Sequence, residues 1–308
     1  MTTSGTESFN LPLTEIVEDA FERCGLEMRT GYDLRTARRS LNLMTIEWAN
    51  RGINLWTIEQ GEIPLATGQT TFALPTDTID LLDHVVRQNN GGPNQIDINI
   101  TRISETGYST IPNKLTQDRP IQVWINRQSG EENATSITLQ NPGIGISATD
   151  TTIQLSSTIG LASVGYIKLG SELIFYGNVS GNTLTLCARG QNKTTAAGHL
   201  NGAAVSVVNQ PCINVWPTAN AGGGYTFVYW RMRRIQDAGG GVRTQDIPFR
   251  FLPCLVAGLA YYVGMKKPEV PPDRLAMLKQ AYEEQWKLAS DEDREKANLR
   301  LVPRQAFW

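Results

Sequence analysis

The chain has 308 residues, of which 40% are hydrophobic and 19% are charged, and its formal net charge at pH 7 is −2. This length allows two or three domains with hydrophobic cores of useful size, and the composition excludes a disordered chain. The small net charge argues against a protein whose main work is coating nucleic acid, because such proteins need a strongly basic surface.

The N-terminal end of the chain carries two helical patterns. From Leu13 to Cys24, apolar residues recur at the spacing of one helix face, and Gly25 follows as a stop signal. A second helix is expected after Gly31, with Gly52 placed as the residue just beyond its C-terminus. Its apolar stripe consists of Leu34, Ala37, Leu41, Met44 and Trp48.

The C-terminal end repeats this pattern. Residues 248–267 are apolar nearly all round, which predicts a helix in the middle of a bundle. Pro253 and two glycines interrupt this segment, so it does not qualify as a membrane span of roughly 20 apolar residues. A last helix is expected over about residues 273–298, with an apolar inner face. Residues 1–58 plus 245–298 are therefore predicted to form one helical bundle domain.

The middle of the chain is rich in strand patterns. Apolar or alternating runs at residues 72–75, 96–100, 121–125 and 225–230 are bounded by Gly, Pro, Asn and Asp. Short strands at this spacing are typical of an antiparallel sandwich or barrel. We expect residues 59–127 plus 210–244 to form a β-rich arm, with a loop or a short helix between Ser104 and Ile111. The fold class predicted for the whole chain is α+β.

Residues 128–209 are predicted to be a small β-module inserted into the arm. Six short strands are expected, at 137–139, 152–155, 165–169, 172–176, 183–187 and 204–208. Ser180-Gly181-Asn182 has the composition of a compact hairpin turn. The flanking segments 121–127 and 213–216 would pair if the module were removed, which places the insertion at a hairpin tip.

The module contains a recognisable series of short motifs. These are residues 170–176 (GSELIFY), residues 179–186 (VSGNTLTL), Arg189-Gly190, residues 194–199 (TTAAGH) and residues 202–205 (GAAV). The series resembles a small β-module that recurs in bacteriophage virion proteins, and the match covers about a quarter of the chain. The resemblance implies a virion component rather than a reaction.

The sequence shows no grouping of residues that is typical of a catalytic or metal site. His84 and His199 are the only histidines, and neither has a His or Cys at metal-ligand spacing. We expect His199 to make a structural turn contact. No Ser lies in a G-x-S-x-G motif, and neither glycine triplet ends as a phosphate-binding loop does. The four scattered cysteines indicate reduced core thiols. No enzyme activity, cofactor or metal is therefore predicted.

Two clusters are candidate binding sites. Arg231, Arg233 and Arg234 end a predicted strand, where they could pair with carboxylates of a neighbouring subunit or contact DNA phosphate. A simple polar strand end is the alternative. The second cluster is the C-terminal tail, residues 299–308, which could plug into a partner's pocket or fold back onto its own domain. Its candidate anchor residues are Arg300, Leu301, Val302, Arg304, Phe307 and Trp308.

Motifs outside the insertion occur in a particular order. They are residues 47–56 (EWANRGINLW), residues 121–127 (IQVWINR), Trp216-Pro217, residues 229–237 (YWRMRRIQD) and residues 255–260 (LVAGLA). This order is similar to that of the head-to-tail adaptor proteins of short-tailed bacteriophages. The smaller adaptors lack the inserted module, so its role does not follow from the resemblance.

The resemblance implies a structural virion protein that forms a ring, expected to be a dodecamer, in the tail or neck of the particle. The ring would assemble in the host cytoplasm without a membrane, join the portal protein to the tail nozzle or fibres, and enclose the channel through which double-stranded DNA passes. In this hypothesis the tail residues anchor to the portal. An alternative is a receptor- or carbohydrate-binding tail component that uses the inserted module. It predicts exposed aromatic rings, whereas Tyr166, Phe175 and Tyr176 are expected to be buried. A depolymerising enzyme is disfavoured because no acid/base pair is visible.

Overall fold

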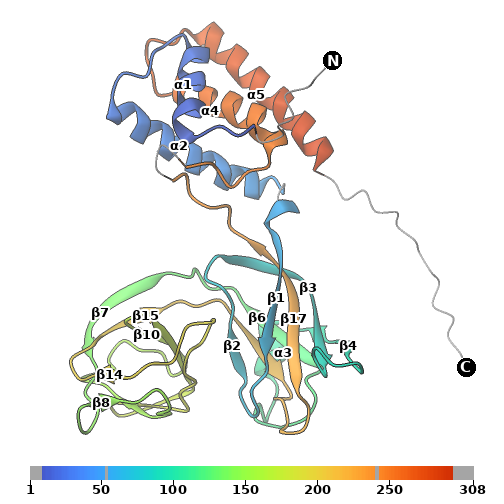
Figure 1. Ribbon diagram of the computed structural model, residues 1–308, viewed down its shortest axis with the longest axis vertical. Coiled ribbons are helices and arrows are strands. Elements are labelled where there is room, and N and C mark those ends of the chain that lie inside the picture. Colours follow the sequence, from blue (N-terminus) through green and yellow to red (C-terminus); the bar gives the residue numbers. More distant parts are fainter. Residues whose placement is uncertain (1–8, 53–54, 240–242, 294–308) are drawn as a thin grey trace, which may run out of the picture. The chain divides into compact units, whose positions relative to one another are not determined.

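The computed structural model describes residues 9–52, 55–239 and 243–293 (Figure 1). The chain divides into two compact units. Unit 1 comprises Met1–Ile58 and Arg234–Trp308, and unit 2 comprises Glu59–Arg233. The described residues form five α-helices and several largely antiparallel sheets, and none of these sheets closes into a barrel. The expected mixed α+β class is confirmed.

Unit 1 is helical and draws its helices from both chain ends. They are α1 (Leu13–Cys24), α2 (Gly31–Asn50), α4 (Leu252–Gly264), α5 (Pro272–Glu292) and the 3₁₀ turns η1 (Leu55–Thr57) and η2 (Phe249–Phe251). The helix expected from residue 248 thus begins as a 3₁₀ turn. The α-helix proper starts at Leu252, and Pro253 lies in its first turn, where a missing N–H is tolerated. Residues 294–298 of the last predicted helix lie outside the described residues.

The helix ends follow the sequence signals. Gly25 ends α1 in the left-handed region, with φ of 76°, and its N–H donates to the Glu22 carbonyl at 2.8 Å. A reciprocal capping box begins α2: the Asp33 amide donates to the Thr30 hydroxyl at 3.3 Å, and the Thr30 amide donates to the Asp33 carboxylate at 3.2 Å. Gly52 follows α2 with φ of 82°. Local chemistry therefore fixes where α1 and α2 stop and start.

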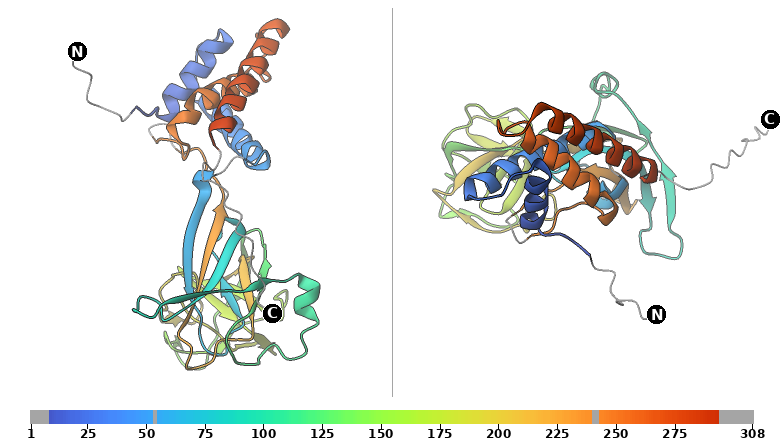
Figure 2. Two further views of the ribbon diagram at one scale, coloured as in Figure 1. Left: turned by 90° about the vertical axis from the view of Figure 1, so that its right-hand side faces the viewer. Right: turned by 90° about the horizontal axis from the view of Figure 1, so that it is seen from above.

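Helix α4 forms the centre of unit 1. Helices α1, α2 and α5 all pack on it, and the view from above shows α4 between α1 and α5 (Figure 2). Leu255, Leu259 and Val263 are completely buried in the shared core. A side chain at Gly258 would collide with Met44 of α2 and Tyr282 of α5, so this glycine permits the close approach of three helices.

Unit 2 contains two four-stranded sheets that share one core. The first has the order β1 (Ile58–Pro64), β17 (Tyr225–Arg233), β3 (Thr78–Gln88) and β4 (Ile96–Asn99). The second has the order β2 (Thr71–Ala73), β16 (Cys212–Trp216), β6 (Gln122–Asn126) and β5 (Thr101–Arg102). Val86 and Phe227 of the first sheet and Val123 and Ile213 of the second belong to the same buried cluster. The segment after β5 forms the short helix α3 (Glu105–Ser109).

Residues 132–208 of unit 2 form three further small sheets. Their strands are β7 (Glu132–Thr138), β8 (Gly145–Ile146), β9 (Ile153–Gln154), β10 (Gly165–Leu169), β11 (Glu172–Tyr176), β12 (Asn178–Ser180), β13 (Thr183–Thr185), β14 (His199–Leu200) and β15 (Ala204–Val208). The sheet orders are β11-β10-β15-β7, β12-β13-β9 and β14-β8. The predicted turn at Gly181, with φ of 58°, connects the antiparallel strands β12 and β13.

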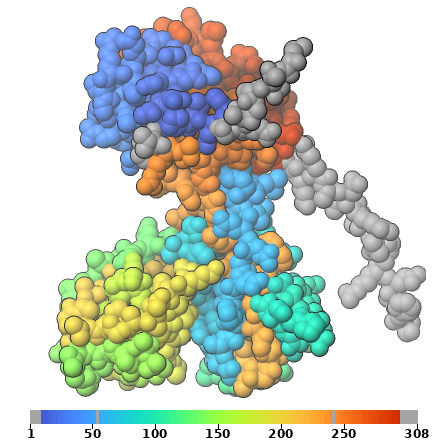
Figure 3. Space-filling model, viewed as in Figure 1, coloured from blue at the N-terminus to red at the C-terminus, as the bar shows by residue number. Residues whose placement is uncertain are grey.

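The segments that flank the module pair with each other. Strands β6 and β16 are antiparallel, with Ile125 opposite Ile213, which confirms the predicted pairing. The module also packs against the arm, because Ala73 and Cys212 share a buried cluster with Phe175. Gln69 donates to Gln191 at 3.4 Å, and the space-filling view shows this part of the module lying against the segment of β1 and β2 (Figure 3).

Candidate functional site

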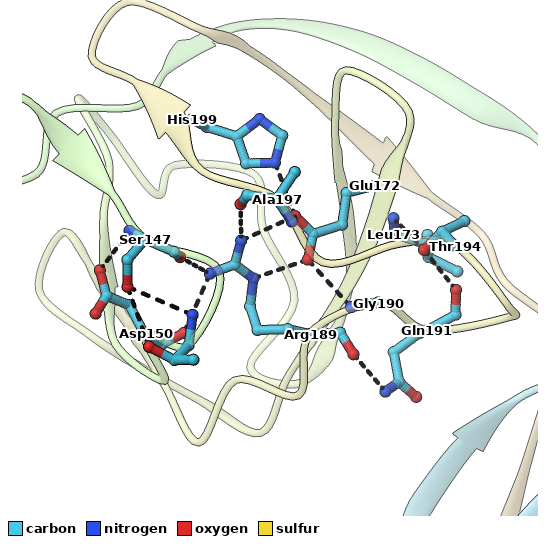
Figure 4. Close-up of polar contacts among 11 residues, drawn as sticks. Ser147, Asp150, Glu172, Leu173, Arg189, Gly190, Gln191, Thr194, Ala197 and His199 are labelled. Atoms are coloured by element: carbon cyan, nitrogen blue, oxygen red, sulfur yellow. Dashed lines mark hydrogen bonds and ion pairs between the residues drawn. The ribbon is translucent and has the colours of Figure 1, made fainter.

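One buried carboxylate joins several segments of the module (Figure 4). Glu172, at the start of β11, is completely buried and accepts two hydrogen bonds of 2.8 Å from the Arg189 guanidinium. The backbone amides of Gly190 and Ala197 each donate to it at 3.1 Å. His199 Nε2 lies 2.7 Å from the same carboxylate. Both carboxylate oxygens therefore have several partners.

The Glu172 carboxyl stays ionised in these surroundings. Burial alone would raise its pKa, but the hydrogen bonds from Arg189, His199 and the two backbone amides outweigh burial and lower the pKa to about 2. A carboxyl with so low a pKa is a poor general acid or base near neutral pH. The arrangement is therefore suited to holding chain segments together rather than to proton transfer.

Arg189 extends this network to the loop of Ser147 and bonds a second time to the segment of Ala197. Its guanidinium donates to the carbonyl of Ser147 at 2.5 Å and to that of Ala197 at 2.6 Å. The side chains of Arg189 and His199 are only 7% and 13% exposed. Three motif segments of the sequence, around Glu172, Arg189 and His199, thus meet at one point. The structural contact expected of His199 is its bond to Glu172.

The two arginines of the cluster that lie in β17, Arg231 and Arg233, pair with carboxylates of unit 2. Arg231 donates to Asp77 Oδ1 at 2.5 Å and to Glu59 Oε2 at 2.8 Å. Arg233 donates to Glu59 Oε1 at 2.6 Å. The side chains of Arg231 and Arg233 are only 10% and 12% exposed. Of the alternatives that the sequence left open, this geometry favours a polar strand end for these two residues. Arg234 follows β17 as the first residue of the second segment of unit 1.

The candidate portal anchor lies outside the described residues. All of its members, Arg300, Leu301, Val302, Arg304, Phe307 and Trp308, belong to the segment 294–308. The anchor remains a prediction from the sequence.

The motif at residues 47–51 connects the two chain ends. Trp48 Nε1 donates to the Tyr282 hydroxyl at 2.9 Å, and Arg51 donates to both Glu283 oxygens at 3.1 Å. The Tyr262 hydroxyl donates to Glu47. Glu283 of α5 thus pairs with Arg51, the residue that follows α2. This motif thus connects the end of α2 to α4 and α5.

Unit 1 presents an apolar groove to solvent. The groove has a volume of about 630 Å³ and runs between α1 and the start of α4. Apolar residues make up most of its lining, and Asp19 and Arg23 form its polar edge. The apolar residues are Phe9, Leu11, Phe249, Leu252, Pro253 and Val256. Phe9 and Phe249 are 74% and 76% exposed, so the groove is a candidate protein-binding surface.

Helix α5 carries a second exposed apolar surface. Met277 and Leu288 are 70% and 65% exposed, and their spacing of 11 residues places them on one helix face. Ala281, also exposed, lies between them on that face. We call Met277, Ala281 and Leu288 the α5 stripe. The groove and the α5 stripe share no residue.

Neither metal chemistry nor known relatives identify the chain. Within residues 9–52, 55–239 and 243–293, no three His, Cys, Asp or Glu side chains gather as a metal site. None of the helices described in these ranges is both long and apolar enough to cross a membrane. Comparison with protein-family models gives no match, and a search of curated proteins gives none either. Function must therefore be inferred from the surfaces and motifs of the chain itself.

Proposed function

We propose that this chain is the ring-forming adaptor that joins the portal to the tail nozzle of a short-tailed bacteriophage. In this proposal the four long helices of both chain ends form a bundle that packs against its neighbours in a closed ring. Residues 59–127 plus 210–244 form a sandwich-like arm that contacts the nozzle or fibres and carries the inserted module. Double-stranded DNA passes through the lumen, and the chain has no catalytic role.

The observation that carries the proposal is the pair of unlike apolar surfaces on unit 1. A ring of identical subunits needs a heterologous interface, in which one surface of a subunit contacts a different surface of the next. The groove between α1 and α4 is concave, and the α5 stripe is a convex helix face. We assign the α5 stripe of one copy to the groove of its neighbour. A heterologous contact between two such surfaces allows a closed ring.

Burial of the exposed apolar side chains favours association. Fully burying a Leu, Met or Phe side chain contributes about 1.5–3 kcal/mol. Phe249, Met277 and Leu288 are mostly exposed in the single chain, so an interface that covers them recovers much of this free energy. Association itself costs several kcal/mol, so no single residue suffices. The two surfaces together provide several apolar side chains.

The position of the adaptor-like motif adds support. Glu47, Trp48 and Arg51 contact the helices of the opposite chain end. Trp48, Trp56 and the helix segment 255–260, which belong to two of the motifs that carry the resemblance, therefore lie in the same helical unit. That unit presents both proposed contact surfaces.

Oligomeric state tests the ring directly. The purified full-length chain, alone and mixed with the portal of its own phage, would be examined by native mass spectrometry and electron microscopy. We expect closed rings, and we expect Leu288→Glu to reduce them strongly because a carboxylate cannot be desolvated in an apolar groove. Lys279→Gln, on another side of the same exposed helix, changes the charge equally and should leave the rings intact.

Two results would contradict this assignment. A chain that stays monomeric under both conditions would reject the ring, and rings that persist in folded Leu288→Glu and Phe249→Glu variants would reject these contact surfaces. Deleting residues 299–308 tests the anchor separately. We expect portal binding to disappear while circular dichroism is unchanged, and unchanged co-assembly would exclude the tail as anchor.

A further inference from the structure

Unit 2 holds a cavity between the arm and the module. Its volume is about 470 Å³, within the range of small-molecule sites. The arm contributes residues of β2, α3, β6 and β16, and the module contributes residues of β10, β11 and β15. Both chain segments that connect the module to the arm thus border this cavity. Neither of the contact surfaces assigned to the ring takes part in it.

Two buried polar atoms at this cavity have no hydrogen-bond partner in the described structure. They are the hydroxyl of Tyr166 and Oε1 of Gln210. Tyr166 and Gln210 are 4% and 2% exposed, and both line the cavity. The Gln210 amide nitrogen donates to the Leu74 carbonyl, which fixes the identity of the free oxygen. Leaving such groups unpaired costs about 1–3 kcal/mol each, so a ligand that donates to Gln210 and bonds to Tyr166 is favoured.

An aromatic platform forms another part of the lining. The rings of Tyr108 and Trp124 stack with centroids 5.4 Å apart and an interplanar angle of 28°. Lys114 is the one cation among the described lining residues, and its ammonium group already donates to the carbonyls of Ser109 and Ile111. Tyr108 is buried and the Lys114 ammonium lies over its ring, 5.4 Å from the centroid, so the partly exposed Trp124 offers the accessible ring face. Such a face suits the apolar C–H face of a pyranose.

Uncharged amides dominate the polar part of the lining. Asn126, Gln128, Asn209 and Asn214 all line the cavity, and each carries both donors and an acceptor. The described lining contains no Asp or Glu. An amide can match a hydroxyl group as donor or acceptor. A cationic ligand would find no carboxylate here, and an anionic one would find only Lys114, whose ammonium group already donates to two carbonyls. The cavity therefore favours a neutral ligand rich in hydroxyl groups.

We propose that this cavity binds a neutral carbohydrate unit, with a pyranose face on Trp124 and hydroxyl groups bonded to Tyr166 and Gln210. The inference goes beyond the adaptor role and does not depend on it. A binding site at the junction of arm and module also gives the inserted module a use that ring formation does not provide. This cavity is the one specific observation that favours a carbohydrate-binding tail component over an adaptor.

Ligand titration of the full-length chain tests the proposal. Glucose, galactose, N-acetylglucosamine and the disaccharides cellobiose and chitobiose would be titrated by saturation-transfer-difference NMR and by thermal shift, with glucuronate as a charged probe. We expect saturable binding of at least one neutral sugar with a Kd of about 1 mM or tighter. Glucuronate should bind at least tenfold more weakly than the neutral sugar that binds most tightly. Tighter binding of a disaccharide than of its monosaccharide would indicate a polymeric glycan, and equal binding a free sugar.

Single substitutions show where the sugar binds. Tyr166→Phe removes only the unpaired hydroxyl, so it should weaken sugar binding at least tenfold without lowering the Tm of the free chain. Trp124→Ala should abolish binding, and Tyr225→Phe, a tyrosine of unit 2 outside the cavity, should bind as the unchanged chain does.

Some outcomes would overturn the proposal. Absence of saturable binding by every neutral probe would mean that the cavity holds only water. Binding that survives both Tyr166→Phe and Trp124→Ala would place any sugar site elsewhere. Ring assembly, measured in the same samples, reports on the adaptor role independently.

Discussion

Trp48 and Tyr282 are joined by a hydrogen bond of 2.9 Å, from the indole Nε1–H to the phenol oxygen, although 234 residues separate them in the chain. Both side chains are almost completely buried. The Trp48 ring also packs on Trp286 with centroids 5.4 Å apart. Helix α2 from one chain end and α5 from the other are therefore connected through a polar contact inside an apolar core, and a buried donor in such a place depends on its acceptor.

Removing the acceptor should destabilise unit 1. Tyr282→Phe leaves the Trp48 N–H buried without a partner, which we expect to lower the free energy of unfolding by about 1–3 kcal/mol. Urea denaturation followed by tryptophan fluorescence measures this change. Tyr32→Phe, at a tyrosine of α2 that is 65% exposed, should change it by less than about 0.5 kcal/mol. Equal effects of the two substitutions would mean that the hydrogen bond contributes nothing.

Loss of the Glu172 charge should destabilise the module. Glu172→Gln keeps the shape of the side chain but leaves the Arg189 guanidinium, 7% exposed, without its counter-charge. Breaking a buried ion pair in this way costs about 3–5 kcal/mol. Hydrogen exchange of the amides in β10 and β11 should accelerate accordingly. The exposed Glu131→Gln serves as the control, and unchanged exchange in Glu172→Gln would show that the network is not needed for folding.

Acid should remove the stability that the ionised Glu172 contributes to the module. The pKa of Glu172 is lowered from 4.5 to about 2, so folding stabilises the ionised form. This difference corresponds to about 3 kcal/mol, which is fully present above pH 4.5 and is lost as the pH falls toward 2. Melting temperatures measured from pH 7 to pH 2 should therefore drop less steeply below pH 4.5 in Glu172→Gln than in the unchanged chain. Parallel curves would contradict the ionised state of Glu172.

The helices could be predicted well because their signals are local. Gly25 and the Thr30 capping box set helix ends within a few residues of sequence, and the stripes at 13–24 and 34–48 repeat at the helical period. Strand β3 was missed although it is the longest strand described. Its pairing with β17 shifts register next to Trp230, so the side-chain alternation breaks near His84 and the period-2 signal disappears.

The contacts of the site residues were beyond sequence reasoning for a different reason. Arg189 lies 17 residues from Glu172, and Arg231 lies 172 residues from Glu59. Neither spacing is a helix or strand period, so only the folded chain brings the charges together. The arginine cluster stood out in the sequence because like charges gather there, whereas its carboxylate partners are dispersed over β1 and the segment before β3. The cavity residues are dispersed in the same way over both parts of unit 2.

The pairing of Arg233 with Glu59 predicts a measurable coupling. In a double-mutant cycle of Arg233→Gln and Glu59→Gln, the two effects on the free energy of unfolding should be less than additive, with a coupling of about 0.5–3 kcal/mol. Additive effects would show that the 2.6 Å contact carries no free energy in solution.

Ring assembly of folded charge-reversal variants at Arg231, Arg233 and Arg234 distinguishes a polar strand end from a contact with a neighbouring subunit or with DNA. Intact rings and virions would exclude a role in subunit or DNA contact.

His84 should make unit 2 sensitive to mild acid. Both of its ring nitrogens are buried without a partner, and the imidazole stacks on Phe227 with centroids 5.8 Å apart. Burial lowers its pKa below 6.5, and Arg102 adds to this effect while Asp83 opposes it. The unfolded chain, with a His pKa of about 6.5, then binds the proton first, so stability is full above that pH and decreases as the pH falls toward the lower folded value.

NMR titration of the His84 ring carbon and proton resonances checks this prediction directly. We expect a midpoint below 6.5, and we expect His84→Phe to weaken the decrease in stability between pH 7 and 5. At pH 7 the substitution should not lower stability, because it replaces two unpaired buried nitrogens by carbon. A midpoint at or above 6.5 would mean that the imidazole has a partner or contact with water that the buried position beside Phe227 does not provide.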